Sequence, residues 1–170
     1  PLRLVGSEMC IRDSYIAFTA EAKRGGDLFG NPYGQLWRLV DEGAGVGSRF
    51  SWTRFVSGGP DDAAQAGRVL AQPDNLVFDR AGNLWVITDM SSKVLAGENP
   101  AYAVFGNNAV FVIPTSGPDA GRPVQFASAP CESELTGPAW TPDERTLFLS
   151  VQHPGERHGC RMPGSGHGSN

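Results

Sequence analysis

Oxygen-bearing side chains stand at the start of two similar stretches of the sequence. Asp74 and Asn75 follow Pro73 in PDNLVFDRAGNLWVITD, while Glu132 and Glu134 precede LTGPAWTPDERTLFLSV. Carboxylates and amide carbonyls are the ligands that a hard cation such as Ca²⁺ prefers. Carboxylates that lie close together also repel one another unless a cation lies between them. One interpretation of the pattern is therefore a cation site to which both stretches contribute.

Simpler structural roles fit the same residues. The side chain of Asp74 can cap its own backbone in an Asx turn. Glutamates such as Glu132 and Glu134 are ordinarily solvated on the surface. The shared position of these acidic residues ahead of two matching stretches favours the cation site, and no single residue does so alone.

Three other polar residues leave more than one interpretation open. Cys131 can serve as a soft ligand for iron or zinc, although a buried and inert thiol is the favoured role. Asn108 belongs to an Asn-Asn pair that is typical of a hairpin turn and could also present a second amide ligand. His153 has no partner at metal-ligand spacing, so it could be a ligand, a donor to phosphate or a surface residue.

Composition and motifs exclude several classes of protein. GxSxG, GxxxxGK[ST] and HExxH are absent, which disfavours serine hydrolases, P-loop proteins and zincins. Three cysteines without CxxC spacing predict neither a disulfide framework nor a zinc site. The net charge is −4 and no run of Lys and Arg is present, so a nucleic-acid surface is not expected. No apolar run approaches the roughly 18 residues of a transmembrane segment.

The acidic residues must be positioned by β-hairpins. In Pro73–Asp89, apolar and polar residues alternate up to the turn DRAGN, and the β-rich run LWVIT follows. A related pattern recurs at Leu135–Val151. The corresponding positions are Phe78 and Trp140, and Leu84 and Leu147. Two hairpins of one form predict repeated four-stranded units placed around an axis.

The rest of the chain also favours short strands. With 22 Gly and 13 Pro, long helices are not expected, and the fold class is all-β. Phe50–Val56 has apolar residues on both faces, which predicts a strand packed between neighbouring blades. One helical turn can begin at Asp61-Asp62, and one short helix within Ser91–Val104. Further strands are expected at Tyr15–Thr19, Gln35–Val40, Ala109–Pro114 and Pro123–Ala127.

The chain divides into three parts. Residues 1–14 contain VGSEMCIRDS, which resembles the translation of a sequencing-adapter read-through, and we expect them to be non-native and disordered or arbitrarily packed. The alternative is a genuine N-terminal strand at Leu2–Val5. Residues 15–156 are expected to form a partial β-propeller of two to three blades, because a six-bladed propeller needs on the order of 240 residues. Residues 157–170 are rich in Gly, Pro, Ser and His, and we expect a disordered or truncated tail.

Three blocks resemble the C-terminal half of the PhoX-type alkaline phosphatases: PDNLVFDRAGNLWVITD, GNNAVFVIPTSGPDAGRPVQFASAP and ELTGPAWTPDERTLFLSVQHPGE. The resemblance covers roughly Tyr15–Glu156. It implies part of a six-bladed propeller whose centre holds calcium and ferric (Fe³⁺) ions and hydrolyses small-molecule phosphate esters. It also implies twin-arginine export, so that the protein would be periplasmic or secreted.

The resemblance extends to individual positions. It implies metal binding by Glu134 of ELTGP and by Asp74 and Asn75 of PDN. It also covers Asn108, His153 and Glu156 as residues lining the site, with no particular role assigned. The iron-ligating cysteine and the export signal are expected in the N-terminal half of the family, outside this chain.

The resulting expectation is a fragment of a secreted calcium- and iron-dependent phosphatase that is inactive on its own. Two alternatives stay open at this point. One is a calcium-dependent hydrolase of the lactonase type, since GNLWV is common in such propellers, and the other is a binding scaffold without metal. The blocks ELTGP and QHPGE favour the phosphatase. Neither the preferred ester nor the oligomeric state follows from the sequence.

Overall fold

The computed structural model describes residues 3–5, 13–19, 31–42, 49–60, 70–95 and 97–155. Within these ranges nearly all regular structure is β. The strands are β1 (Arg3–Val5), β2 (Asp13–Phe18), β3 (Gln35–Asp41), β4 (Phe50–Ser57), β5 (Pro73–Phe78), β6 (Leu84–Thr88), β7 (Ala109–Ile113), β8 (Val124–Ser128), β9 (Glu134–Trp140) and β10 (Leu147–Gln152). Two short helices, α1 (Ser92–Leu95) and the 3₁₀ helix η1 (Pro100–Phe105), lie between β6 and β7.

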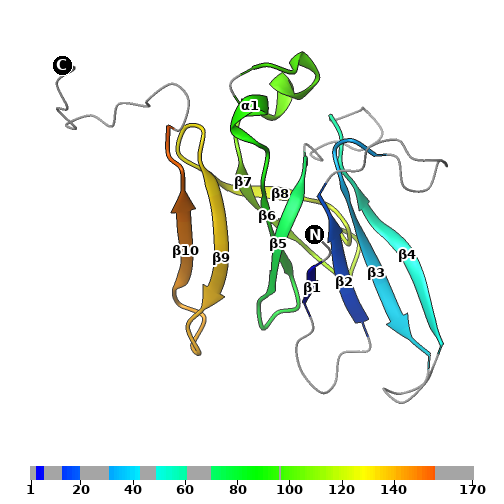
Figure 1. Cartoon of the computed structure of the whole chain (residues 1–170). Helices are drawn as coiled ribbons and strands as arrows, with labels where there is room; N and C mark the ends of the chain where they lie inside the picture. Colours follow the sequence, from blue (N-terminus) through cyan, green and yellow to red (C-terminus); the bar gives the residue numbers. More distant parts are fainter. Residues whose placement is uncertain are drawn as a thin grey trace, which may run out of the picture.

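The strands form successive antiparallel sheets in chain order. The first sheet has the order β1-β2-β3-β4, the second β5-β6-β7-β8, and β9 pairs with β10 in a third. Each strand therefore pairs with its neighbour in the chain, and the sheets follow one another across the molecule (Figure 1). Consecutive four-stranded meanders of this kind are the blades of a β-propeller. The described residues thus contain two four-stranded blades and one hairpin.

The predicted central hairpin is present, and Asp79 organises its turn. The Asp79 carboxylate accepts hydrogen bonds from the backbone N–H of Asn83 at 2.8 Å and from Nε1 of Trp85 at 2.9 Å. Gly82 supplies a φ of 81° in the same turn. Burial alone would raise the pKa of Asp79, but the hydrogen bonds from Trp85, Asn83 and Ala81 lower it below its ordinary value.

The predicted correspondence between the two hairpins is confirmed by their registers. Phe78 pairs with Leu84 beside the turn of β5–β6, and Trp140 pairs with Leu147 beside the turn of β9–β10. The two turns also touch, since the backbone N–H of Arg80 donates to the Glu144 carboxylate at 2.9 Å. The hairpins therefore lie side by side with the same orientation.

Strand β6 lies at the centre of the core because all five of its residues are buried. Alternate side chains of a strand point to opposite faces. Leu84 and Val86 join one apolar cluster with residues of the first sheet, whereas Trp85 and Ile87 join another that includes Leu135 of β9. Trp85 also packs edge-on against Trp140, with ring centroids 4.9 Å apart. The second sheet is thus packed on both faces, as an inner blade requires.

Strand β4 corrects one expectation. The side chains of Phe50 and Trp52 are 59 % and 47 % exposed, and Val56 is the buried residue of the strand. The strand lies at the edge of its sheet. The prediction that Phe50–Val56 packs between two neighbouring blades is therefore wrong for the described structure. Apolar residues on both faces of a strand predict a second sheet on each face, but the described structure has no second sheet that covers Phe50 and Trp52.

The N-terminal part of the chain starts its strands earlier than expected. β2 begins at Asp13, whose carboxylate pairs with Arg38 of β3 at 2.5 Å, and β1 pairs with β2. Arg3–Val5 and the first two residues of β2 fall within residues 1–14, so these described residues belong to the first sheet. The non-native origin of these residues stays a prediction. The helical turn predicted at Asp61-Asp62 and the tail at 157–170 lie outside the described residues.

Cys131 corrects another expectation, because it is exposed and disulfide-bonded rather than a buried free thiol. The other two cysteines, Cys10 and Cys160, lie outside the described residues. A sparse and odd set of cysteines was a weak basis for excluding a disulfide, since one pair can form among three. None of the described helices is long and apolar enough to cross a membrane.

Candidate metal centre

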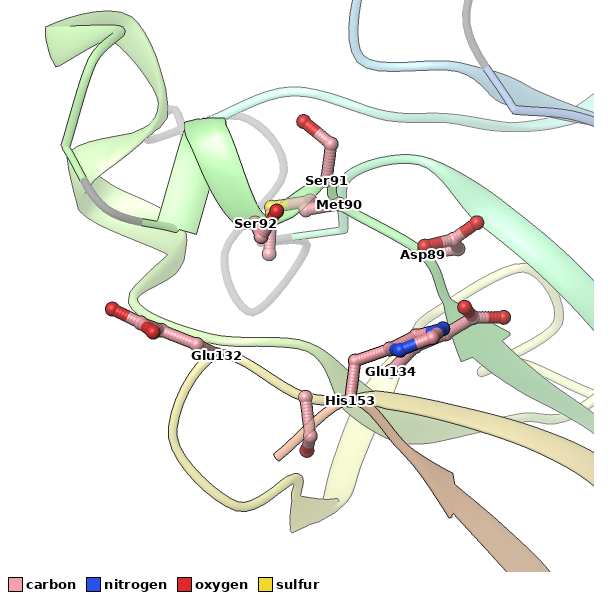
Figure 2. Close-up of a pocket in the computed structure, with 8 residues that line it drawn as sticks. Asp89, Met90, Ser91, Ser92, Glu132, Glu134 and His153 are labelled. Carbon is pink, nitrogen blue, oxygen red and sulfur yellow. The ribbon is translucent and has the colours of Figure 1, made fainter. Parts of the chain in front are cut away.

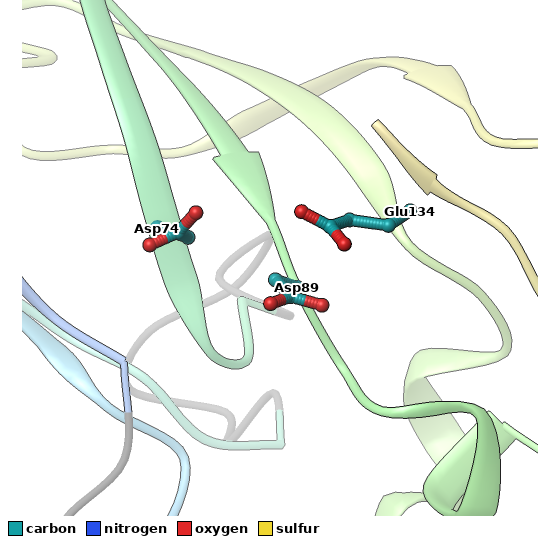
Figure 3. A group of neighbouring side chains, drawn as sticks. All are labelled: Asp74, Asp89 and Glu134. Carbon is teal, nitrogen blue, oxygen red and sulfur yellow. The ribbon is translucent and has the colours of Figure 1, made fainter. Parts of the chain in front are cut away.

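Three carboxylates meet at the end of the central hairpin that lies away from its turn. Asp74 is the second residue of β5, Asp89 directly follows β6, and Glu134 is the first residue of β9. Each offers a carboxylate oxygen within 4.8 Å of the other two, and all three side chains are half-buried. The side chains approach one another from their separate elements (Figure 3). We refer to Asp74, Asp89 and Glu134 as the carboxylate cluster.

Strand pairing explains how residues distant in sequence meet there. β5 and β6 are antiparallel, with Pro73 opposite Thr88, so the start of one strand lies beside the end of the other. Asp74 and Asp89 each follow one member of this pair in the chain. The third carboxylate comes from β9, which packs against both β5 and β6. The predicted meeting of Asp74 and Glu134 therefore occurs.

The side chain of Asn75 connects the Asp74 carboxylate to β9. Its side chain is buried, its Nδ2 donates to the Asp74 carboxylate, and its Oδ1 accepts from the backbone N–H of Gly137 at 3.4 Å and from the Thr136 hydroxyl at 3.3 Å. A backbone N–H must have an acceptor, so the amide oxygen belongs on the Gly137 side. Asn75 thus turns its N–H₂ group toward the cluster, and the ligand role inferred for it from the sequence stays a prediction.

The electrostatics of the cluster reflect its crowding. Burial raises the pKa of Asp89, and the charge of Asp74 raises it further. Burial also raises the pKa of Glu134, followed by the charges of Asp89 and Asp74. His153 opposes both shifts. A bound cation would relieve the same repulsion, because opposite charge favours the ionised form of a carboxyl group.

The cluster opens into a pocket of about 260 Å³. Asp89 and Glu134 belong to both the cluster and the pocket wall (Figure 2). The complete lining consists of Asp89, Met90, Ser91, Ser92, Glu132, Ser133, Glu134 and His153. A small polar ligand in this pocket would therefore lie next to two of the three carboxylates.

Two pocket residues have unusual backbones. Glu132 and His153 have φ values of 54° and 51°, a region that residues other than glycine rarely adopt. Glu132 is 7 % exposed, whereas His153 is exposed to solvent. His153 thus lies at the site, as the sequence suggested, and its role there stays a prediction.

The remaining predicted residues lie elsewhere. Asn108 is fully buried behind the pocket wall, where it bonds to Met90 and Ser133. Glu156 lies outside the described residues. Asp89 was missed by sequence reasoning, although a signal was available. It ends the hairpin that Asp74 opens, and antiparallel pairing brings the two ends of a hairpin together.

The donor set fits calcium. Ca²⁺ binds oxygen ligands at about 2.3–2.6 Å, so two of its ligands lie at most about 4.6–5.2 Å apart. The separation of up to 4.8 Å among the three carboxylate oxygens falls within that limit. Carboxylates alone suit hard cations better than soft ones. The pocket beside the cluster leaves room for water or a further ligand to complete the coordination shell.

An all-β chain with successive four-stranded blades, and carboxylates converging at one end of its central hairpin, is a partial β-propeller with a candidate metal centre. Its sequence matches the family described as Alkaline phosphatase PhoX over residues 9–155. The chain therefore belongs to the PhoX alkaline phosphatase family, as the resemblance of its motifs indicated.

A solved structure agrees with this assignment. Pseudomonas fluorescens PhoX in complex with vanadate, a transition state analogue, is similar with a TM-score of 0.68 and 31 % sequence identity. The match covers 86 % of this chain and 28 % of that one, so the chain spans little more than a quarter of the solved protein. A search of curated proteins found no match.

Proposed function

We propose that this chain forms part of a metal-dependent phosphatase that hydrolyses phosphate esters, with calcium held by Asp74, Asp89 and Glu134. The observation that carries the proposal is the carboxylate cluster beside a pocket in a chain of the PhoX family. Vanadate is bound, as a transition state analogue, by the similar Pseudomonas protein. A pocket that accepts a phosphoryl group is therefore a reasonable expectation here.

Charge explains why cations are needed. A phosphate ester is anionic, and the carboxylate cluster with Glu132 would repel it from the pocket. Bound calcium would supply positive charge that offsets the negative charge of the phosphoryl oxygens and of the leaving oxygen. The chain's own contribution is to fix three carboxylates at strand ends, which costs no rearrangement when substrate arrives.

His153 is proposed to contact the substrate or to balance charge at the pocket. It lines the pocket, and its charge acts on both Asp89 and Glu134. A side chain on the pocket wall can donate an N–H to a phosphoryl oxygen. Because His153 follows β10 directly, its position is fixed by the pairing of β10 with β9.

Ferric iron is a further expectation from the family resemblance. The described residues offer oxygen ligands at the cluster, a donor set that favours calcium. We therefore propose that iron is held mainly by residues of the parent protein beyond this chain. The chain spans 28 % of the Pseudomonas protein. We therefore also propose that the isolated chain binds calcium but does not turn over substrate.

An exported location is part of the proposal. Cys131 is disulfide-bonded, and disulfides persist in oxidising compartments such as the bacterial periplasm. This supports the periplasmic or secreted location that the resemblance implies. A cytoplasmic protein would ordinarily keep such a thiol reduced.

The test is to measure calcium binding and phosphatase activity separately on the purified 170-residue chain. Isothermal titration calorimetry should detect calcium binding, and Asp89→Asn should weaken it strongly. Hydrolysis of p-nitrophenyl phosphate with Ca²⁺ and Fe³⁺ should not exceed that of the metals alone. No calcium binding by the folded chain would contradict the proposed site, and turnover well above the metal control would contradict the proposed inactivity.

A further inference from the structure

Asn108 has every polar group of its side chain engaged in the interior. The side chain has no exposed surface. Its Oδ1 accepts from the backbone N–H of Met90 at 2.6 Å and from the Thr88 hydroxyl at 3.2 Å. Its Nδ2 donates to the backbone oxygens of Met90 and Ser133, each at 3.0 Å. A buried amide with all of its bonds made holds its partners in one arrangement.

These partners flank two members of the carboxylate cluster. Thr88 and Met90 lie on either side of Asp89 in the chain, and Ser133 directly precedes Glu134. One side chain thus joins the segment that carries Asp89 to the segment that carries Glu134. The two segments belong to different sheets, and Asn108 lies just before β7 between them.

On the side of β5 the backbone N–H of Asp89 still donates to the Gln72 oxygen at 2.9 Å, but on the side of β7 the ladder ends before Asp89. The pairing of β6 with β7 stops at Ile87 opposite Val110. Beyond that point the Met90 backbone bonds to Asn108 through both its N–H and its oxygen. The amide of Asn108 therefore replaces a strand partner at the place where the chain leaves the sheet.

The orientation of the amide is fixed by its partners. Backbone N–H of Met90 requires an acceptor, and the oxygens of Met90 and Ser133 require donors. An aspartate of the same shape would keep the acceptor but present oxygen to two carbonyl oxygens. Position 108 therefore requires both the oxygen and the N–H₂ group of an amide, and a side chain of the same shape with other polar groups does not fit.

We propose that Asn108 is a positioning residue for the metal centre, which sets the separation of the Asp89 and Glu134 carboxylates without touching the cation. This rests on the proposed calcium site. Residues that orient metal ligands commonly change metal affinity about 10–100-fold when substituted. Asn108→Ala and Asn108→Asp should both weaken calcium binding by roughly that factor.

The test compares these variants with Ile113→Ala in the same 170-residue chain. Ile113 is fully buried at the other end of β7, so its truncation lowers stability without touching either ligand segment. Calcium affinity is measured by calorimetry at a temperature where circular dichroism shows each variant to be folded. Terbium, bound in place of calcium, reports through its luminescence lifetime how many waters coordinate it. The Asn108 variants should lose affinity and gain coordinated water, whereas Ile113→Ala should melt earlier with both quantities unchanged.

The outcomes separate this inference from the function on which it rests. If the wild-type chain binds no calcium, or if Asp89→Asn binds it as well as wild type, the calcium site itself fails. If wild type binds and Asp89→Asn does not, but Asn108→Ala and Asn108→Asp both keep wild-type affinity and hydration, the positioning role fails. Asn108→Ser, which keeps one hydroxyl for Met90, is measured by the same criteria if Asn108→Ala does not fold.

Discussion

The side-chain amide of Asn75 donates a hydrogen bond to the carboxylate of its chain neighbour Asp74. The other end of the same amide accepts the backbone N–H of Gly137 on β9. Asn75 therefore connects the first carboxylate of the cluster to the strand that begins with the third, Glu134. The cluster depends on contacts between sheets as well as on the pairing within one.

Asn75→Ala should destabilise the chain and weaken calcium binding. The substitution removes the hydrogen bonds that the buried Asn75 amide makes to Asp74, to the Thr136 hydroxyl and to the backbone N–H of Gly137. Each hydrogen bond of this kind contributes about 0.5–1.5 kcal/mol to the unfolding free energy. Urea denaturation with and without calcium measures both effects. Asn99→Ala is the matched control, because Asn99 caps the helix η1 on the surface and lies outside the cluster. Equal effects of the two substitutions on calcium affinity would contradict the role given to Asn75.

The unfolding free energy of the calcium-free chain should fall as the pH rises through the range in which the cluster ionises. The pKa values of Asp89 and Glu134 are raised, chiefly by burial. In the unfolded chain these groups ionise near their ordinary values of about 4. Between the ordinary and the raised pKa, the folded state holds more protons than the unfolded state. Stability therefore decreases with rising pH over that window.

Calcium should remove this decrease, because it favours the ionised carboxylates of the folded state. Urea denaturation from pH 4 to pH 7, with and without calcium, tests the sign. Asp89→Asn removes one of the repelling charges, so the calcium-free variant should show a shallower decrease than wild type. It should also gain little from added calcium. A calcium-free stability that rises across the whole range would contradict the electrostatic account of the cluster.

Much of this site follows from the sequence because hairpins obey local rules. The turn chemistry around Asp79, the alternation in β5 and the β-rich run of β6 placed the central hairpin, and the repeated pattern placed Glu134 near Asp74. The same reasoning could have predicted Asp89, because antiparallel pairing places the end of β6 beside the start of β5. What could not be predicted depends on contacts between elements.

The amides illustrate the limit. A sequence pattern shows that Asn75 and Asn108 are polar and near the site, but not which way each amide points. Those directions are set by Gly137, which lies in β9, and by Ser133, which directly precedes β9. The exposure of Trp52 could not be predicted either, because it depends on whether another element covers β4 and not on the sequence of the strand.

Asp79→Ala should destabilise the chain most strongly at neutral pH. The Asp79 carboxylate accepts from Trp85 Nε1 and from Asn83, so its loss leaves the indole N–H of the buried Trp85 without an acceptor. Burial opposes ionisation, but these hydrogen bonds together lower the pKa of Asp79. Its stabilising effect is therefore present above the ordinary pKa and is lost as the pH falls through the lowered value. The expected loss at pH 7 is about 1–3 kcal/mol, measured by urea denaturation.

Asp143→Ala provides the comparison for Asp79. Asp143 occupies the corresponding turn of β9–β10, where it bonds to Thr141 and to the backbone of Arg145 on the surface. No buried group loses its partner there, so the chain should keep nearly all of its stability. Losses of the same size in both variants would contradict the importance given to the contact between Asp79 and Trp85.

The disulfide at Cys131 should support the metal centre. Of three cysteines, two form one disulfide, which leaves one free thiol in the denatured, unreduced chain and three after reduction. Cys131 stands just before Glu132 and Glu134, and its backbone oxygen accepts the N–H of Gly155 at 2.9 Å. The hydrogen bond joins the segment that leads into β9 to the residues after β10, and the disulfide adds a covalent restraint at Cys131.

Reduction, or Cys131→Ser, should lower the melting temperature, because removing a disulfide typically costs about 2–5 kcal/mol. It should also weaken calcium binding, because the segment that leads to Glu134 loses a restraint. Thiol titration verifies the reduction, and scanning and titration calorimetry measure the melting temperature and the calcium affinity. Ile113→Ala, which lowers stability away from the cluster, is the control for the effect of lost stability on affinity. Calcium affinity that is unchanged on reduction would show that the disulfide acts on stability alone and leaves the ligands in place without it.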